Sequence, residues 1–267
     1  MVPRGRRQFR FLHGDSRSTR RLSPRPAGAP ARLPLYWSHS SRRATQAINA
    51  MRTRIKICGL TREEDIDAAV AAGVDAIGFV FYPKSKRYVT PTRAAQLRRV
   101  VPAFVDVVAL FVNPSPDEVR AVLDEVGPEL LQFHGDETPQ DCARHGHRYL
   151  RAFRAGAPGL ETAEGLATYC RAFGEAAGWL FDSYSAGFGG SGHGFDHALL
   201  ADVKADPVSR PLILSGGLNP DNVAAAVQSV RPWAVDVSSG VEVEQGIKSS
   251  DRISFFVAAV HVADAKK

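Results

Sequence analysis

Two side chains that can exchange protons stand at the ends of apolar runs. Cys58 closes the run RIKIC (54–58), and Asp182 follows the apolar residues of GWLFDS (178–183). A thiolate can act as a base or a nucleophile, and a carboxyl group with a raised pKa can act as an acid. Lys56, two residues before Cys58, can favour the thiolate by its charge. The pair predicts acid–base catalysis, although a cysteine taken alone is more often a small buried hydrophobe.

Two Gly/Ser segments indicate a phosphate site. The segment SGGLNPDN (215–222) and the tripeptide SSG (238–240) each follow an apolar run. In an eight-stranded α/β barrel, the loops after strands 7 and 8 commonly bind phosphate through backbone N–H groups. The candidate phosphate-binding residues are Ser215, Gly216, Gly217, Ser238, Ser239 and Gly240. A third stretch, GFGGSGHG (187–194), lacks the Lys-Ser/Thr ending of a P-loop, and we interpret it as a mobile loop over the site.

A basic loop follows the second apolar run. The segment YPKSKRYV (82–89) offers Lys84, Lys86 and Arg87. A guanidinium can hold a carboxylate through two parallel hydrogen bonds, so Arg87 is a candidate anion ligand. The alternative is a solvated basic loop.

Histidines give a weaker signal. His134 is as easily a hydrogen-bonded structural residue as a functional one, and His193 and His197 are expected on the surface of a loop. No spacing of histidines and carboxylates indicates a metal site. We therefore predict no metal.

Short apolar runs alternate with helical windows from residue 54 onward. The expected strands are 54–58, 76–81, 105–112, 129–134, 148–153, 178–183, 211–216 and 233–238. The expected helices are 62–72, 91–100, 116–126, 138–145, 161–173, 196–204, 220–229 and 251–263. Eight strand–helix pairs predict a single α/β domain of the (β/α)8 barrel type. A doubly wound open sheet is the alternative, but it does not usually need eight such even repeats.

Helix-end signals support these boundaries. Thr61 with Glu64 reads as a capping box at the start of the first helix, and Gly73 reads as its C-terminal glycine. Pro116 is placed for a first helical turn.

Strand side chains alternate between the barrel interior and the helix-facing layer. Apolar residues must face the helices, which places Ile55, Ile57, Leu131, Phe133, Trp179, Phe181, Val235 and Val237 outside. The interior then receives Lys56, Cys58, Gln132, His134, Asp182, Asp236 and Ser238. Buried polar groups cost about 1–3 kcal/mol each unless partnered. So many of them near the strand ends predict a functional site.

Charge is distributed very unevenly along the 267 residues. The formal net charge is +6, but residues 1–50 hold eleven arginines and one acid, a balance of +10, which leaves −4 for the other 217 residues. No stretch has the roughly 18 uncharged apolar residues of a membrane helix. Cys58, Cys142 and Cys170 are too few and too scattered for a disulfide framework. These features exclude an integral membrane protein and favour a reducing, cytoplasmic location, with Cys142 and Cys170 as buried hydrophobes.

We divide the chain into a disordered basic extension, 1–50, and a catalytic barrel domain, 51–267. The Arg-, Ser- and Pro-rich extension shows no sustained apolar period. It could be an organelle transit peptide, a nucleic-acid-binding arm, or sequence upstream of a true start at Met51. An organellar location follows only from the first of these.

Taken together, the motifs resemble those of the phosphoribosylanthranilate isomerase family of tryptophan biosynthesis. They keep the family's order: KICGLT (56–61), GFVFYPKSKRYV (78–89), LQFHGDE (131–137), FDS (181–183) with GGSG (189–192), LSGGLNPDNV (214–223) and VDVSSGVE (235–242). The resemblance implies a (β/α)8 barrel that catalyses an Amadori rearrangement of N-(5-phosphoribosyl)anthranilate without a metal or an organic cofactor.

The resemblance also implies residue roles. Cys58 corresponds to the general base and Asp182 to the general acid. Arg87 is expected to hold the anthranilate carboxylate, and the SGG and SSG segments the phosphate. Gln132, Asp236 and Lys56 are expected to line the substrate pocket. One departure is Gly246-Ile247-Lys248-Ser249, where the family commonly has Gly-x-Lys-Asp.

The resemblance also indicates the expected binding partners, and two alternative functions have to be weighed against it. The expected partner is a small molecule, with other enzymes of the pathway as further candidates and neither nucleic acid nor membrane. A two-aspartate isomerase of histidine biosynthesis needs an aspartate where Cys58 stands. A nucleic-acid-binding barrel using the Arg-rich extension is the rival from another class.

Overall fold

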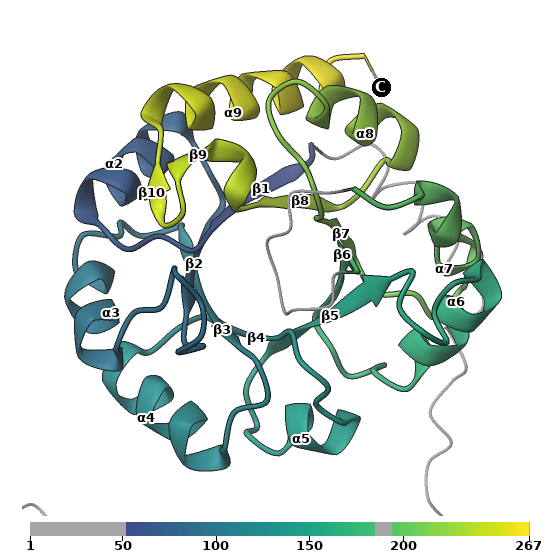
Figure 1. Cartoon of the computed structure of the whole chain (residues 1–267), viewed down its shortest axis with the longest axis horizontal. Helices are drawn as coiled ribbons and strands as arrows, with labels where there is room; N and C mark the ends of the chain where they lie inside the picture. The colour runs from purple at the N-terminus through teal and green to yellow at the C-terminus, as the bar shows by residue number, and fades with distance from the viewer. Residues whose placement is uncertain (1–51, 185–193, 267) are drawn as a thin grey trace, which may run out of the picture. The chain divides into compact units, whose positions relative to one another are not determined.

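Eight parallel strands pair in sequence order and close into one barrel (Figure 1). The computed structural model describes residues 52–184 and 194–266. The barrel strands are β1 (Arg54–Cys58), β2 (Ala76–Val80), β3 (Asp106–Phe111), β4 (Leu130–Phe133), β5 (Tyr149–Ala155), β6 (Gly178–Ser183), β7 (Leu212–Leu214) and β8 (Ala234–Val237). Pairing of β1 with β8 closes the ring. The predicted (β/α)8 barrel is confirmed.

Helices surround the barrel on its outside. They are α2 (Glu63–Ala72), α3 (Pro91–Arg98), α4 (Pro116–Val126), α5 (Pro139–Ala143), α6 (Ala163–Arg171), α7 (Ala201–Ala205), α8 (Val223–Val230) and α9 (Ser250–Asp264). A 3₁₀ turn, η1 (His197–Leu200), leads into α7, so the window expected at 196–204 is two short helices. None of the described helices has the length and apolar character needed to cross a membrane.

One excursion was not predicted. After β8 the chain forms a 3₁₀ turn, η2 (Ser239–Val241), and an antiparallel hairpin of β9 (Glu242–Glu244) and β10 (Ile247–Lys248). The predicted extension, 1–50, and residues 187–193 of the glycine-rich stretch 187–194, interpreted as a loop over the site, lie outside the described residues.

The helix-end predictions are confirmed except at the start of the first helix. Gly73 ends α2 with φ +86°, which suits a residue without Cβ, and Pro116 occupies the first turn of α4. The capping box at Thr61 is wrong, because α2 is preceded by Arg62, which makes no side-chain cap. The Thr61 hydroxyl instead donates to the carbonyl of Gly246 at 2.9 Å.

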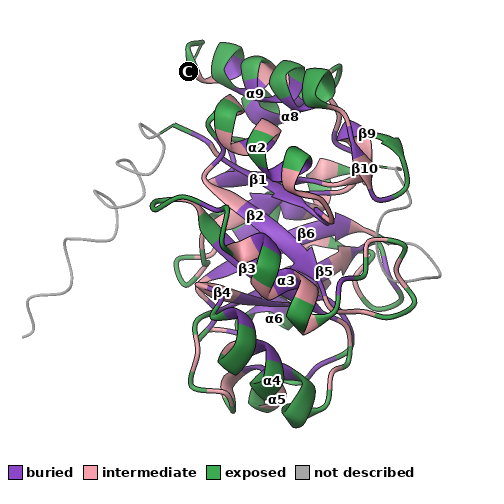
Figure 2. Ribbon diagram, turned by 90° about the vertical axis from the view of Figure 1, so that its left-hand side faces the viewer, coloured by how far each residue is buried: buried purple, intermediate pink, exposed green. Residues whose placement is uncertain are grey.

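Two of the three buried apolar clusters of the described residues make up the body of the barrel, and the third, of Cys58, Val80 and Leu110, lies at the pocket. Between strands and helices lies the large core, which contains all eight residues that we predicted to face outward. Inside the barrel lies a smaller layer of Val108, Leu150, Ala152, Leu180, Ile213 and Ala234. In Figure 2 the strands are buried and the outward faces of the helices are exposed. Burying each large side chain contributes about 1.5–3 kcal/mol.

The interior changes character toward the carboxyl ends of the strands. Above the apolar layer lie the buried polar residues Lys56, Gln132, His134, Asp182 and Asp236. These are the positions that alternation assigned to the interior. The apolar layer thus forms a closed floor, and polar chemistry is confined to one end of the barrel, where barrel enzymes carry their active sites.

A buried ion pair outside the barrel fixes the loop after β4. Arg151 donates to Glu137 at 2.7 Å and to the carbonyls of Phe133 and Gly135. Glu137 in turn accepts the backbone N–H groups of Asn113 and Gly135. This network holds the polypeptide that immediately follows the barrel-facing His134.

Candidate active site

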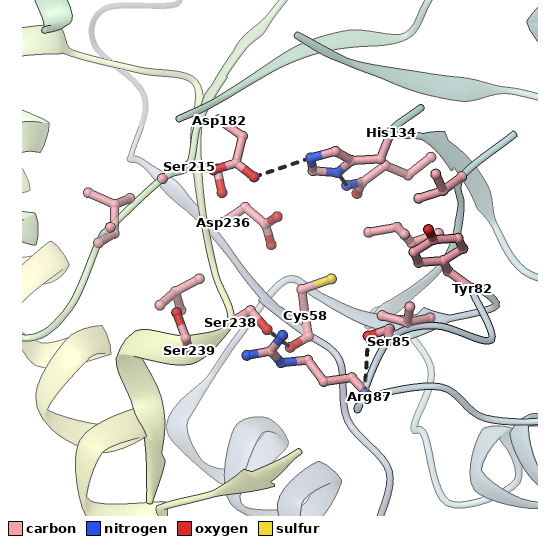
Figure 3. Close-up of a pocket in the computed structure, with 18 residues that line it drawn as sticks. Cys58, Tyr82, Ser85, Arg87, His134, Asp182, Ser215, Asp236, Ser238 and Ser239 are labelled. Carbon is pink, nitrogen blue, oxygen red and sulfur yellow. Dashed lines mark hydrogen bonds and ion pairs between the residues drawn. The ribbon is translucent and has the colours of Figure 1, made fainter. Parts of the chain in front are cut away.

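A pocket opens at the carboxyl end of the barrel, and most of the predicted site residues line it (Figure 3). Those on the pocket wall are Cys58, Arg87, Gln132, Asp182, Ser215, Gly216, Gly217, Asp236, Ser238 and Ser239. Lys56 and Gly240 are not on the wall. Figure 3 shows the sulfur of Cys58 pointing into the space between the Asp182–His134 pair and Arg87.

Lys56 and Asp236 form a buried ion pair next to Cys58. Lys56 Nζ lies 2.8 Å from Asp236 Oδ1, and both side chains are 6% exposed. The Lys56 ammonium also interacts with the Cys58 thiol. Burial lowers the pKa of Lys56, but the charges of Asp236 and Cys58 outweigh burial, so the net shift is upward. The lysine is therefore a cation at neutral pH.

The Cys58 thiol experiences opposing effects. Burial raises its pKa, the Lys56 charge lowers it, and the Asp236 charge raises it, for a net upward shift. Gly78, on the neighbouring strand, makes room for the sulfur, because a Cβ at that position would lie 2.8 Å from Sγ. The thiol is thus closely confined, and its ionisation is favoured mainly by Lys56, with a smaller contribution from the charge of Lys248.

Asp182 is held by two contacts. Its Oδ1 accepts the backbone N–H of Ser183 at 2.8 Å, and its Oδ2 lies 3.2 Å from His134 Nε2. The other ring nitrogen of His134 lies 3.2 Å from Gln132 Nε2. The Oε1 atom of this buried glutamine has no hydrogen-bond partner among the described residues. His134, which the sequence left between two readings, thus connects Gln132 to Asp182.

Arg87 reaches the pocket across the loop that follows β1. Its Nε and Nη2 each donate to a carboxylate oxygen of Glu242 at 2.7 Å. Gly59 (φ +76°) allows this crossing, because a Cβ there would lie 2.5 Å from Arg87 Cδ. Lys84 and Lys86 of the same basic segment are exposed and do not line the pocket.

The two Gly/Ser loops lie side by side at the pocket wall (Figure 3). Gly216 and Gly217 both have positive φ, and among the described residues no hydrogen bond uses their backbone N–H groups. Gly240 has another role in the structure, because a Cβ on it would lie 1.9 Å from the carbonyl oxygen of Leu218. Gly240 thus lets the two loops approach each other.

Two groups of residues were not found by sequence reasoning. Val80, Tyr82, Leu110 and Val112 form an apolar part of the pocket wall. Strand alternation applied to Val80 and Leu110 places both side chains inside the barrel, and this was the available signal for these two residues. Glu242 and Lys248 form the second group, described below. The available signals were the glutamate at the end of VDVSSGVE and the lysine of Gly246-Ile247-Lys248-Ser249, where the family commonly has Gly-x-Lys-Asp.

Other chemical side chains lie outside the pocket. Cys142 and Cys170 are buried in the outer core, as predicted, and burial raises the pKa of Cys142 to about 12. His197 begins η1 and does not line the pocket, while His193 is outside the described residues. Over residues 52–184 and 194–266, no three His, Cys, Asp or Glu side chains gather in a way that could hold a metal ion.

Comparison with known proteins identifies the family. The family model for N-(5'phosphoribosyl)anthranilate (PRA) isomerase matches residues 55–259. The N-(5'-phosphoribosyl)anthranilate isomerase of Bordetella bronchiseptica is 73% identical over 214 residues, which cover 80% of this chain and 98% of that protein. The enzyme of the same name from Dechloromonas aromatica is 54% identical over 216 residues, with 80% and 99% covered.

Solved structures agree with these relatives. Phosphoribosylanthranilate isomerase from Thermotoga maritima is 38% identical with a TM-score of 0.70, and the match covers 79% of this chain and 99% of that one. A phosphoribosylanthranilate isomerase in complex with reduced 1-(o-carboxyphenylamino)-1-deoxyribulose 5-phosphate is 36% identical with a TM-score of 0.68 and the same coverage. The chain therefore belongs to the N-(5'-phosphoribosyl)anthranilate isomerase family.

Proposed function

We propose that Cys58 and Asp182 carry the two proton transfers of the family's reaction. The chain is an aldose–ketose isomerase of tryptophan biosynthesis, and it converts N-(5-phosphoribosyl)anthranilate into 1-(2-carboxyphenylamino)-1-deoxyribulose 5-phosphate. What carries the proposal is that a thiol on β1 and a carboxyl group on β6 line one pocket, together with a guanidinium and two glycine-rich loops.

Asp182 acts first, as the acid. It donates its proton to the furanose ring oxygen while the bond from that oxygen to C1′ breaks, and the anthranilate nitrogen supplies the electrons for a Schiff base. The position of His134 supports this role. If Gln132 turns its amide so that Oε1 accepts from Nδ1–H, then His134 Nε2 can accept a hydrogen bond from protonated Asp182, because the two ends of a carboxamide have nearly the same shape.

Cys58 acts second, as the base. Its thiolate removes the proton on C2′, which leaves an enolamine. The enolamine then tautomerises to the ketone, gaining a proton at C1′ and losing one from the C2′ oxygen. No proton is consumed overall. The buried Lys56 ammonium beside Cys58 supports this role because it offsets part of the cost of a buried thiolate.

Arg87 holds the anthranilate carboxylate in this proposal. A guanidinium has five N–H donors, and Glu242 occupies only the edge formed by Nε and Nη2. The edge formed by Nη1 and Nη2 stays available for a second carboxylate. The apolar wall of Tyr82, Leu110 and Val112 suits the benzene ring.

The phosphate sits at the loops after β7 and β8. Gly216 and Gly217 contribute unused N–H groups, and η2 begins with Ser239, so that its N-terminus faces the same loops. Ser215, Ser238 and Ser239 line the pocket beside them. The cytoplasmic location and contacts with other enzymes of the pathway stay predictions.

Substitution of the two catalytic residues tests the proposal. Cys58→Ser and Asp182→Asn should each lower kcat by about 10²–10⁴-fold, measured as the loss of substrate fluorescence. Cys142→Ala and Asp202→Asn are matched controls, since Cys142 is buried outside the pocket and Asp202 is exposed on α7. Circular dichroism establishes that each variant is folded. Near-parental kcat in either catalytic variant contradicts the assignment.

A further inference from the structure

We propose that Glu242 and Lys248 are positioning residues for Arg87, and that together they give the carboxylate subsite its orientation and its net positive charge. The inference rests on the role proposed above for Arg87. It gives a function to the β9–β10 hairpin, which contributes no side chain to the pocket wall.

The three side chains form a buried chain of ion pairs. Arg87 donates twice to Glu242, and Lys248 Nζ lies 2.8 Å from Glu242 Oε1. Side-chain exposure is 12% for Arg87, 4% for Glu242 and 0% for Lys248. Lys248 also donates to the carbonyl of Ser238 at 3.0 Å, and the Ser238 hydroxyl donates to the carbonyl of Cys58. The ion pairs are therefore continuous with the pocket wall.

The count of charges explains why two cations share one carboxylate. An Arg87–Glu242 pair alone is neutral, and it would attract a substrate carboxylate only weakly. With Lys248 the three groups carry a net charge of +1. A buried lysine is costly unless paired. Burial lowers the pKa of Lys248, the Glu242 carboxylate opposes that effect, and the net shift is downward. Lys248 and Arg87 share the Oε1 atom of Glu242, but only Arg87 lines the pocket, so the guanidinium is the cation of this group that a ligand meets.

Glu242 also selects the orientation of Arg87. Because Nε and Nη2 each donate to one oxygen of Glu242, the guanidinium cannot rotate freely about the end of its side chain. Its remaining N–H groups, on Nη1 and Nη2, then point away from Glu242. A guanidinium held this way meets a planar carboxylate without losing further side-chain freedom. Gly59 keeps the path of the Arg87 stem open on the other side.

The hairpin is anchored by contacts that do not involve Arg87. Glu242 and Lys248 face each other in the β9–β10 register. The carbonyl of Gly246 accepts from Thr61, the backbone N–H of Lys248 donates to Asp65, and Arg252 donates to the carbonyl of Glu242. These contacts fix the position of Glu242, and Glu242 in turn orients Arg87.

The test compares two substrates in steady-state kinetics on the full chain. One is N-(5-phosphoribosyl)anthranilate, and the other is N-(5-phosphoribosyl)aniline, which lacks the carboxylate and is made by condensing ribose 5-phosphate with aniline. Glu242→Gln should raise KM for the first substrate about 10- to 100-fold with a smaller change in kcat, and Lys248→Met should raise it about 10-fold. For the aniline substrate the KM of both variants should stay within about threefold of the parent's KM.

The control variants separate positioning from general damage. Glu63→Gln removes an equally bidentate partner from Arg93 on the surface, and it should leave both substrates unaffected. Glu242→Asp keeps the charge and should restore most of the KM; it also serves if Glu242→Gln does not fold.

Two outcomes overturn the inference for different reasons. Equal losses on both substrates in Glu242→Gln and Glu242→Asp, or an unchanged KM for the anthranilate substrate, mean that Glu242 only stabilises the fold. If Arg87→Met itself fails to discriminate between the substrates, the proposed role of Arg87 is wrong and the inference is lost with it. Discrimination by Arg87→Met without discrimination by Glu242→Gln or Lys248→Met rejects the inference alone.

Discussion

Gly78 offers a way to move the Cys58 sulfur without changing any reactive group. A Cβ at residue 78 would lie 2.8 Å from Cys58 Sγ, 3.2 Å from Cys58 Cα and 3.3 Å from Lys56 Cε. Gly78 is not among the residues with positive φ, so Gly78→Ala introduces no backbone strain. The substitution therefore acts by contact alone, and the thiol is the part of the neighbourhood that can yield.

The size of the effect follows from that contact. Ordinary contacts of a Cβ begin at about 3.4 Å, so the sulfur must move by several tenths of an ångström. Misplacing a reacting group by about 1 Å can cost about 100-fold in rate. We expect Gly78→Ala to lower kcat about 5- to 50-fold, with little change in KM, because in the proposed mechanism the thiolate acts on the reacting carbon and does not anchor the substrate. Overpacking should also cost about 1–3 kcal/mol of stability.

The assay is steady-state fluorescence of substrate loss, together with thermal unfolding. Gly73→Ala is the matched control. Gly73 has φ +86° and nothing within 4 Å of its virtual Cβ, so alanine there should destabilise the protein by about 1 kcal/mol and leave kcat unchanged. A folded Gly78→Ala enzyme with kcat within twofold of the parent would refute the reasoning, since the reaction would then tolerate a displaced sulfur.

Three further predictions concern charge and capping. Lys56→Met should raise the pKa of Cys58 further and move the alkaline rise of kcat/KM to higher pH; an unshifted profile contradicts the role of the lysine. The same variant leaves Asp236 buried without its cation and should lose about 3–5 kcal/mol in urea unfolding. Ser249→Ala should cost about 0.5–2 kcal/mol without changing kcat, because the Ser249 hydroxyl caps α9, whereas Ser249→Asp should keep the stability; equal losses in both would argue against the cap. Burial raises the pKa of Glu242, but its bonds to Arg87 and the charge of Lys248 lower it more, so the folded value lies below the ordinary 4.5. Its contribution to stability is present above pH 4.5 and is lost as the pH falls through the folded pKa. Glu242→Gln should therefore lose less stability than the parent as the pH falls from 4.5 through the folded pKa of Glu242 in urea unfolding, and an identical loss would contradict this.

Local sequence patterns were enough for the barrel and its interior. Alternation placed Lys56 and Cys58 inside because Ile55 and Ile57 had to face helices, and the structure confirms that placement. The same rule worked for Asp182, since it depends only on the period of a strand and on the position of the apolar core.

Contacts between segments far apart in the sequence could not be predicted from strand alternation. The capping box at Thr61 failed because its hydroxyl has a better-placed partner in Gly246, in a hairpin that the sequence did not reveal. Strands β9 and β10 have three and two residues, too few for any period to appear. The role of Glu242 could not be predicted, because its two cationic partners come from another loop and from across the hairpin.

The pairing of Arg87 with Glu242 spans 155 residues of sequence. During translation Arg87 leaves the ribosome first, and at about 5–20 residues per second its partner follows about 8–30 s later. In that interval a nascent chain holds the guanidinium without the carboxylate that orients it. Competence to bind substrate therefore arrives late in synthesis, with the hairpin after the last barrel strand. A chain interrupted just before Glu242 should bind the substrate more weakly than the complete chain.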